Sequence, residues 1–261
     1  MQPIKIKFLY REEGSGSITP INAKAVPSLS SPPNTRNMHA IITTSKGTRI
    51  RGFVHKKQKS TTYITIPEPH PVVLYFNAAQ SFYQRVEESR RHLFEHLESS
   101  QPNVNSQLNA LYVFFSYMTA YTTFLYNTIE SFMNISIPID YKYKRIKNTQ
   151  TEILDQKQIQ RFAKFEEKIK SIIPEIKGKI FHIEMPQEYN YILKLKECRD
   201  EIIHTKNSPD PAPYGHLFNL ALDFNYKDSI SSVMTYINYY EPDLIEYHSP
   251  QTSASLSQNN S

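Results

Sequence analysis

The spacing of apolar residues changes along the chain, and the change occurs near residue 67. Before it, apolar and polar residues alternate with a period of two, which is typical of half-buried β-strands. The strands we predict cover residues 4–10, 39–44, 49–55 and 61–66. They predict a small antiparallel sheet with a turn at residues 45–48, and a long loop over residues 14–37, which are rich in Ser, Pro and Asn.

From Val72 onward the apolar residues recur about every 3.6 positions, as they do in amphipathic helices. The predicted helices cover residues 74–98, 106–134, 155–172, 187–205 and 226–240. The second is apolar on most sides, which is typical of a helix at the centre of a bundle. We expect residues 142–152 to form a loop, and Pro174 to end the third helix.

The proline-rich run Pro67-Glu68-Pro69-His70-Pro71 separates the two patterns, because proline cannot donate to a strand ladder and restricts the preceding residue. We therefore expect a small β-rich domain at residues 1–66 and a mainly α domain, a helical bundle, at residues 67–248. Residues 249–261 are rich in Ser, Gln and Asn and are expected to form a disordered tail.

Charge is distributed unevenly between these domains. Residues 1–66 hold eleven Lys and Arg against two acids, a net charge of +9, while the whole chain carries +5. Such a basic segment favours a polyanionic partner, and RNA or DNA phosphate is the commonest one, although a merely solubilising surface is the alternative. The candidate nucleic-acid contacts are Arg49, Arg51, Lys56, Lys57 and Lys59.

Several classes of protein are disfavoured by what the sequence contains. No apolar stretch approaches the roughly 18 residues of a membrane span, and no secretory signal is visible, so we expect a cytoplasmic protein with no membrane partner. The single cysteine, Cys198, excludes an intrachain disulfide and a cysteine-rich metal site. Without a glycine-rich phosphate loop, an ATPase or a dinucleotide enzyme is disfavoured, and we expect no cofactor.

The fourth predicted helix carries the most specific motif. Its run Arg199-Asp200-Glu201-Ile202-Ile203-His204 resembles the last catalytic helix of the HEPN superfamily, in which four to six residues separate an Arg from the His that follows it. Glu130 and Asn134 interrupt the apolar second helix, as polar residues do in the central helix of that family. They share one side of the helix and need buried partners, for which a packed Arg is a candidate.

The resemblance implies a HEPN-like helical bundle with a metal-independent endoribonuclease activity, acting as a toxin or an anti-phage defence effector. Cleavage of RNA without metal uses the 2′-hydroxyl as nucleophile. His204 would transfer protons near neutral pH and Arg199 would bind the scissile phosphate, with Asp200, Glu130 and Asn134 as supporting residues. The competing hypothesis is a non-catalytic HEPN module that binds nucleotide, nucleic acid or a protein partner.

The spacing of the motif has a geometrical consequence. Five residues on an α-helix rotate by about 140°, so Arg199 and His204 do not share one face of a straight helix. They converge only at a distorted helix end or between two protomers, and family ribonucleases generally act as dimers. We therefore expect a homodimer, with an antitoxin or regulatory protein as a further partner. Some family members have a Tyr two residues after the His, where this chain has Lys206, a candidate phosphate contact.

Two other patterns have an ordinary structural interpretation. His92 and His96 are four residues apart, a spacing compatible with two metal ligands, but an exposed polar face is the default and we expect no metal site. The tyrosines near the end of the chain, Tyr236, Tyr239, Tyr240 and Tyr247, could stack on bases, but at helical spacing they more often pack a core or a dimer interface.

Overall fold

The structure is a computed structural model of the 261-residue chain. It describes residues 4–6, 17–20, 39–43, 49–56, 58–59, 63–147, 150–204 and 214–247. The protein is mainly helical and forms two compact units, one within residues 8–70 and the other made of residues 1–7 and 71–261.

The smaller unit holds a four-stranded antiparallel sheet in the order β2-β3-β4-β5. Its strands are β2 (Ser17–Pro20), β3 (His39–Thr43), β4 (Arg49–Lys56) and β5 (Tyr63–Pro67). The last three follow the predicted alternation closely. β2 was not predicted and lies where we expected a loop, and the predicted turn at 45–48 lies outside the described residues.

The first predicted strand pairs differently from our expectation. β1 (Ile4–Ile6) is antiparallel to β8 (Ile245–Tyr247), with Ile4 opposite Tyr247, and both strands belong to the helical unit. Alternation indicates that a segment is a strand, but its partner is set by tertiary packing, which the pattern does not contain. The predicted tail, residues 249–261, lies outside the described residues.

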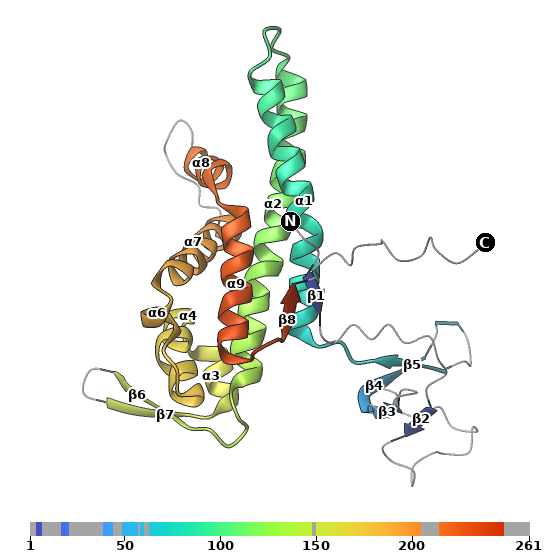
Figure 1. Ribbon diagram of the computed structural model, residues 1–261, viewed down its shortest axis with the longest axis vertical. Coiled ribbons are helices and arrows are strands. Elements are labelled where there is room, and N and C mark those ends of the chain that lie inside the picture. The colour runs from blue at the N-terminus through green and yellow to red at the C-terminus, as the bar shows by residue number, and fades with distance from the viewer. Residues whose placement is uncertain are drawn as a thin grey trace, which may run out of the picture. The chain divides into compact units, whose positions relative to one another are not determined.

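The helical unit is built around α2 (Val104–Ser136), which forms a long antiparallel hairpin with α1 (Pro71–Leu97) (Figure 1). α7 (Pro186–Ile203) and α9 (Tyr226–Tyr240) pack against α2 and against each other, and α8 (Gly215–Asp223) contacts α7. The four long helices lie where the 3.6-residue pattern predicted them, and α9 has the predicted bounds. Among the described residues, no helix is both long and apolar enough to cross a lipid bilayer.

The second predicted helix is central only over its C-terminal half. Side chains from Phe114 to Met133 include a buried series in the core, whereas Val104, Leu108 and Tyr112 near its start are exposed. Figure 1 shows the reason, since the loop end of the α1–α2 hairpin extends beyond the other helices of this unit.

The tyrosines of α9 serve the core. Tyr236 is fully buried and stacks edge-on against Phe132 and Phe181, and Tyr240 is also buried. Tyr121 in α2 donates a hydrogen bond of 2.6 Å to the carbonyl of Tyr226. Burial of these rings identifies core packing, not base stacking, as the role of Tyr236 and Tyr240, while the side chain of Tyr247 is outside the described residues.

The segment that we predicted to be a loop, residues 142–152, is a β-hairpin. Its strands are β6 (Tyr143–Lys147) and β7 (Gln150–Leu154), with Tyr143 opposite Leu154. Alternation is present, but the inward position between Tyr143 and Lys147 is the charged Arg145, whose partner Glu167 follows 22 residues later. A charged inward residue hides the apolar alternation that normally indicates a strand.

The predicted third helix, residues 155–172, is broken into short segments. These are α3 (Gln156–Phe162), α4 (Phe165–Glu167) and the π-helical turn η3 (Lys168–Ile172). Two further short helices, α5 (Ile173–Lys177) and α6 (Phe181–Glu184), follow beyond the predicted end. Asp155 and Gln158 form a capping box that begins α3. We predicted that Pro174 would end the third helix, but the helical path continues past it. The backbone widens into a π turn just before Pro174, and this turn accommodates the N–H that proline lacks.

Candidate functional site

The helix that carries the motif is held by its apolar side. Tyr189, Ile192, Leu195 and Cys198 are buried, and they recur every third residue along α7. Burial raises the pKa of the Cys198 thiol to about 12, so that the thiol stays protonated near neutral pH. Cys198 is therefore a core residue and not an activated nucleophile, and Arg199 and Asp200 follow it at the edge of the core.

Arg199 is anchored by a ring and a carboxylate. Its guanidinium carbon lies 4.7 Å from the centroid of the Tyr126 ring in α2, and its Nη1 donates to Asp200 Oδ1 at 2.9 Å. Lys196 Nζ donates to the other Asp200 oxygen at 2.7 Å. Partial burial acts to raise the pKa of Asp200, but the hydrogen bonds from Lys196 and Arg199 outweigh it and lower that pKa.

Tyr126 links this cluster to Glu130. Tyr126 and Glu130 are four residues apart on α2 and so share one side of the helix, and the pKa of Tyr126 is raised by burial and then by the negative charge of Glu130. Glu130, which is half-buried, is therefore joined to α7 through the Tyr126 ring. We expected a packed Arg as a direct partner of Glu130 or Asn134, and the structure places a tyrosine between Arg199 and Glu130.

Asn134 lies on the other side of Glu130 and has a lysine as its partner. Lys168 in η3 is only 2% exposed, and its Nζ donates to Asn134 Oδ1 at 2.9 Å and to the carbonyl of Gln160 at 3.0 Å. Burial lowers the pKa of Lys168, and the charge of Glu130 acts in the opposite direction. The supporting residues thus form one polar row from Asp200 and Arg199 through Tyr126 and Glu130 to Lys168 and Asn134.

Lys168, Lys196 and Tyr126 were missed in the sequence. Lys168 had a signal, because Phe165, Lys168, Ile169 and Ile172 follow helical spacing and place a lysine within an otherwise apolar stripe. A charged residue in that position requires a buried partner. Tyr126 and Lys196 had no comparable signal, since an aromatic residue in an apolar helix and a lysine four residues before an aspartate are both common.

His204 is placed apart from this row. It is the C-cap of α7, its backbone N–H donates to the carbonyl of Asp200 at 2.9 Å, and its side chain is exposed. The helix is regular up to Ile203, so the rotation of about 140° between Arg199 and His204 holds. Within the described residues no hydrogen bond joins the two side chains, and Lys206 lies outside those residues.

The basic residues of the small unit are described only in part. Arg49 and Arg51 belong to β4, and Lys56 ends that strand with an exposed side chain. Lys59 is exposed in the connection to β5, where its φ of 56° is in the left-handed region. Lys57 lies outside the described residues.

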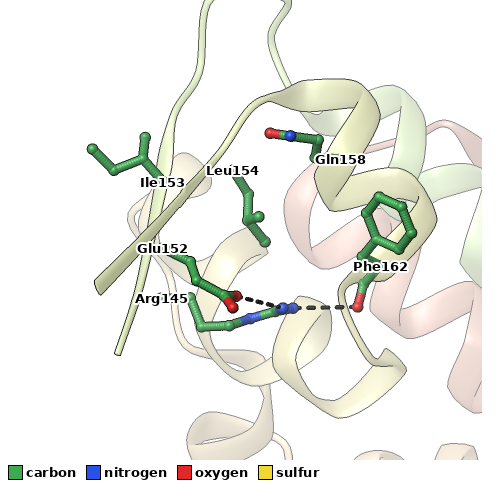
Figure 2. Close-up of a pocket in the computed structure, with 6 residues that line it drawn as sticks. All are labelled: Arg145, Glu152, Ile153, Leu154, Gln158 and Phe162. Atoms are coloured by element: carbon green, nitrogen blue, oxygen red, sulfur yellow. Dashed lines mark hydrogen bonds and ion pairs between the residues drawn. The ribbon is translucent and has the colours of Figure 1, made fainter. Parts of the chain in front are cut away.

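A surface hollow of about 470 Å³ lies in another part of the helical unit. It is lined by Arg145, Glu152, Ile153, Leu154, Gln158 and Phe162, and none of these belongs to α7 (Figure 2). Figure 2 shows Arg145 between Glu152 and the Phe162 carbonyl, to which it donates at 3.3 Å in each case. Two further bonds bind it to Glu167, so this guanidinium is engaged in holding the hairpin.

Comparisons with protein-family models, with curated proteins and with solved structures gave no match.

Proposed function

We propose that the protein is a metal-independent endoribonuclease of the HEPN type that acts as a toxin or anti-phage defence effector. The observation that carries the proposal is the end of α7, where an exposed His204 follows an Arg199 whose guanidinium is fixed at the edge of the core. An exposed imidazole is accessible to RNA, and a fixed guanidinium is prepared to bind phosphate without first losing side-chain freedom.

In the proposed reaction His204 exchanges protons with the 2′-hydroxyl nucleophile or with the leaving 5′-oxygen. Arg199 stabilises the charge that develops on the phosphate. The attack forms a bond from the 2′-oxygen to phosphorus while the bond to the 5′-oxygen breaks, so the products carry a 2′,3′-cyclic phosphate and a 5′-hydroxyl. Asp200, Glu130 and Asn134 act as positioning residues, because each lies in the row that orients Arg199.

The reaction needs two protomers under this proposal. Since Arg199 and His204 point away from a common face of α7, the Arg of one chain and the His of its partner would have to line a shared cleft. The basic residues Arg49, Arg51, Lys56, Lys57 and Lys59, with Lys206, would then attract RNA through its phosphates.

A second candidate function is a non-catalytic HEPN module that binds nucleotide, nucleic acid or a protein partner. It is favoured by the contacts of Arg199, because Asp200 and the Tyr126 ring already compensate the guanidinium within one chain. An arginine held in this way can serve the fold alone.

Cleavage of a mixed RNA substrate in EDTA tests the proposal. Purified wild-type protein should produce fragments with 2′,3′-cyclic phosphate ends. Arg199→Ala and His204→Ala should each lower the rate about 100-fold or more, since a positioned acid or base contributes about 10²- to 10⁴-fold. His216→Ala, an exposed histidine on α8, is the matched control and should cut at the wild-type rate.

Mixing the two inactive variants tests the shared cleft. Heterodimers of Arg199→Ala and His204→Ala retain one intact Arg and one intact His, so the mixture should recover part of the activity. Equal cutting by all variants would overturn the proposal. Binding of RNA without cleavage by the wild-type protein would instead establish the non-catalytic module.

A further inference from the structure

Two histidines, His92 and His96, approach each other closely in the last two turns of α1, next to the loop that joins α1 to α2. The Nε2 atoms of His92 and His96 are 3.1 Å apart, a distance at which one ring donates a hydrogen bond to the other according to their tautomers, and the rings meet edge to face with centroids 4.4 Å apart. Because residues four apart share one side of a helix, the two imidazoles reach the same point above its surface. The proposed RNA chemistry uses neither of them.

The separation of the two nitrogens fits a transition metal. Zinc binds imidazole nitrogen at about 2.0–2.1 Å, and two such ligands at tetrahedral or octahedral angles lie about 2.9–3.4 Å apart. The observed 3.1 Å falls within this range. Imidazole nitrogen is also a preferred ligand of nickel and copper, whereas magnesium and calcium prefer oxygen.

The neighbours of the pair support ligation. Glu95 Oε2 lies 3.5 Å from His92 Nδ1, so this carboxylate favours a proton on Nδ1 and leaves the Nε2 lone pair for a metal. Arg91 Nε is 3.8 Å from the other Glu95 oxygen. His96 is fixed through its backbone, since Gln107 of α2 donates to the His96 carbonyl at 3.2 Å.

The site is open and lies far from Arg199. The His92 side chain is 60% exposed, and the described residues contain no group of three or more His, Cys, Asp or Glu that could hold a metal. The other coordination positions would therefore be filled by water or by groups other than these described residues. Gln107, which contacts His96, and Tyr126, which contacts Arg199, are 19 residues apart on α2, or about 28 Å along the helix axis.

We propose that His92 and His96 form a two-histidine site for a divalent transition metal ion of the zinc, nickel or copper type. Water or a ligand of a partner molecule completes the coordination. The distance from α7 makes this site independent of the proposed RNA cleavage, which stays metal-independent. The polar face that we expected from the sequence is exposed, since the His92 side chain is 60% exposed, and the proposal adds a metal ion to it because of the 3.1 Å approach.

Titration calorimetry on the full chain, with any histidine tag removed and after treatment with EDTA, tests the proposal. Ni²⁺ and Zn²⁺ should bind, and Co²⁺ should bind more weakly than Ni²⁺, as the usual order of metal affinities requires. His92→Ala and His96→Ala should each weaken binding by more than about tenfold, since even an outer-shell partner contributes about 10- to 100-fold. His216→Ala should bind like the wild type.

A second measurement assigns the binding to these residues. Paramagnetic Ni²⁺ should broaden the imidazole NMR signals of His92 and His96 before those of the other histidines. One metal per chain or one per two chains would both fit the proposal, with the second indicating four imidazoles from two copies. Equal affinity of the wild type and the double variant, or first broadening at other histidines, would overturn it whether or not the protein cleaves RNA.

Discussion

Arg145 and Arg199 are both largely buried, but the two regions of the helical unit hold them in different ways. The Arg145 side chain is 19% exposed and donates four hydrogen bonds, two to Glu167, one to Glu152 and one to the Phe162 carbonyl. The Arg199 side chain is 25% exposed, lies over the Tyr126 ring and bonds to the adjacent Asp200.

The difference shows how an arginine that serves the fold can be distinguished from one that is available to a ligand. Arg145 connects segments distant in sequence, and a bidentate carboxylate occupies the edge of the guanidinium that would otherwise bind phosphate. Arg199 is supported on its flat face by a ring, an arrangement that fixes the orientation of the guanidinium plane. We therefore expect Arg145 to contribute more to stability and Arg199 more to function.

Removal of each guanidinium should give the largest difference in unfolding free energy between the two regions. Arg145→Ala should lower the free energy of unfolding by about 2 kcal/mol, because it leaves Glu167 partly buried without its partner, and partial exposure moderates that cost. Arg199→Ala should cost only about 1 kcal/mol, in line with a single cation–π contact and a weak ion pair with the adjacent Asp200. Urea unfolding followed by circular dichroism measures both values.

Arg91→Ala is the control for that measurement. The Arg91 side chain is 76% exposed and its pair with Glu95 is 3.8 Å long, so its removal should change stability by less than about 0.5 kcal/mol. A larger loss for Arg199→Ala than for Arg145→Ala would reverse our assignment of the two arginines.

The sequence predicted the long helices of this unit but not the hairpin that carries Arg145. Long apolar stripes locate α1, α2, α7 and α9, since such periodicity reflects burial along many turns. The hairpin that carries Arg145 was missed, because the residue that faces the bundle is charged and its partner Glu167 belongs to a later segment. Ion pairs between distant segments depend on the fold, which local patterns do not contain.

The candidate site was predicted as residue types and not as contacts. The motif identified Arg199, Asp200 and His204, and the polar interruptions of an apolar helix identified Glu130 and Asn134. Their connection through Tyr126 and Lys168 required the packing of α2 against α7 and η3. The proposed shared cleft would be a property of two protomers and depends on contacts between chains, which local sequence patterns do not contain.

Substitutions of Tyr126 should have a smaller effect on stability and should show which part of this side chain supports Arg199. Tyr126→Phe keeps the ring beside Arg199 and the stacking on Phe165, at 5.3 Å between centroids, but removes the hydroxyl that is influenced by the charge of Glu130. It should cost no more than about 1 kcal/mol of unfolding free energy, the usual upper contribution of one polar contact, and leave RNA binding unchanged.

Tyr126→Leu is the matched variant for this prediction, because it removes the aromatic face as well. It should weaken RNA binding in addition to lowering stability, as Arg199 loses its support. If the Phe variant weakened RNA binding as much as the Leu variant does, the hydroxyl and not the ring would be what orients Arg199.

The smallest expected effect is a loss of folding stability at acidic pH. The hydrogen bond from Arg145 lowers the pKa of Glu167 against the opposing influence of burial, whereas for Asp200 burial is the largest single influence and offsets much of the lowering. A carboxyl group with a lowered pKa stabilises the fold above its unfolded pKa, and this stabilisation is lost as the pH falls through the folded value. Wild-type stability should therefore decrease below about pH 4.5.

Glu167→Gln should reduce this acid sensitivity measurably, and Asp200→Asn should reduce it less. The comparison requires unfolding free energies at about pH 6 and about pH 3, where these carboxyl groups change from ionised toward neutral. Asn and Gln keep the size of the side chains, so differences in the pH slope report the charge and not the packing. An equal change in pH slope for Asp200→Asn and Glu167→Gln would mean that both arginines hold their carboxylates with the same strength. The acid sensitivity of stability would then not distinguish the region of Arg145 from the region of Arg199.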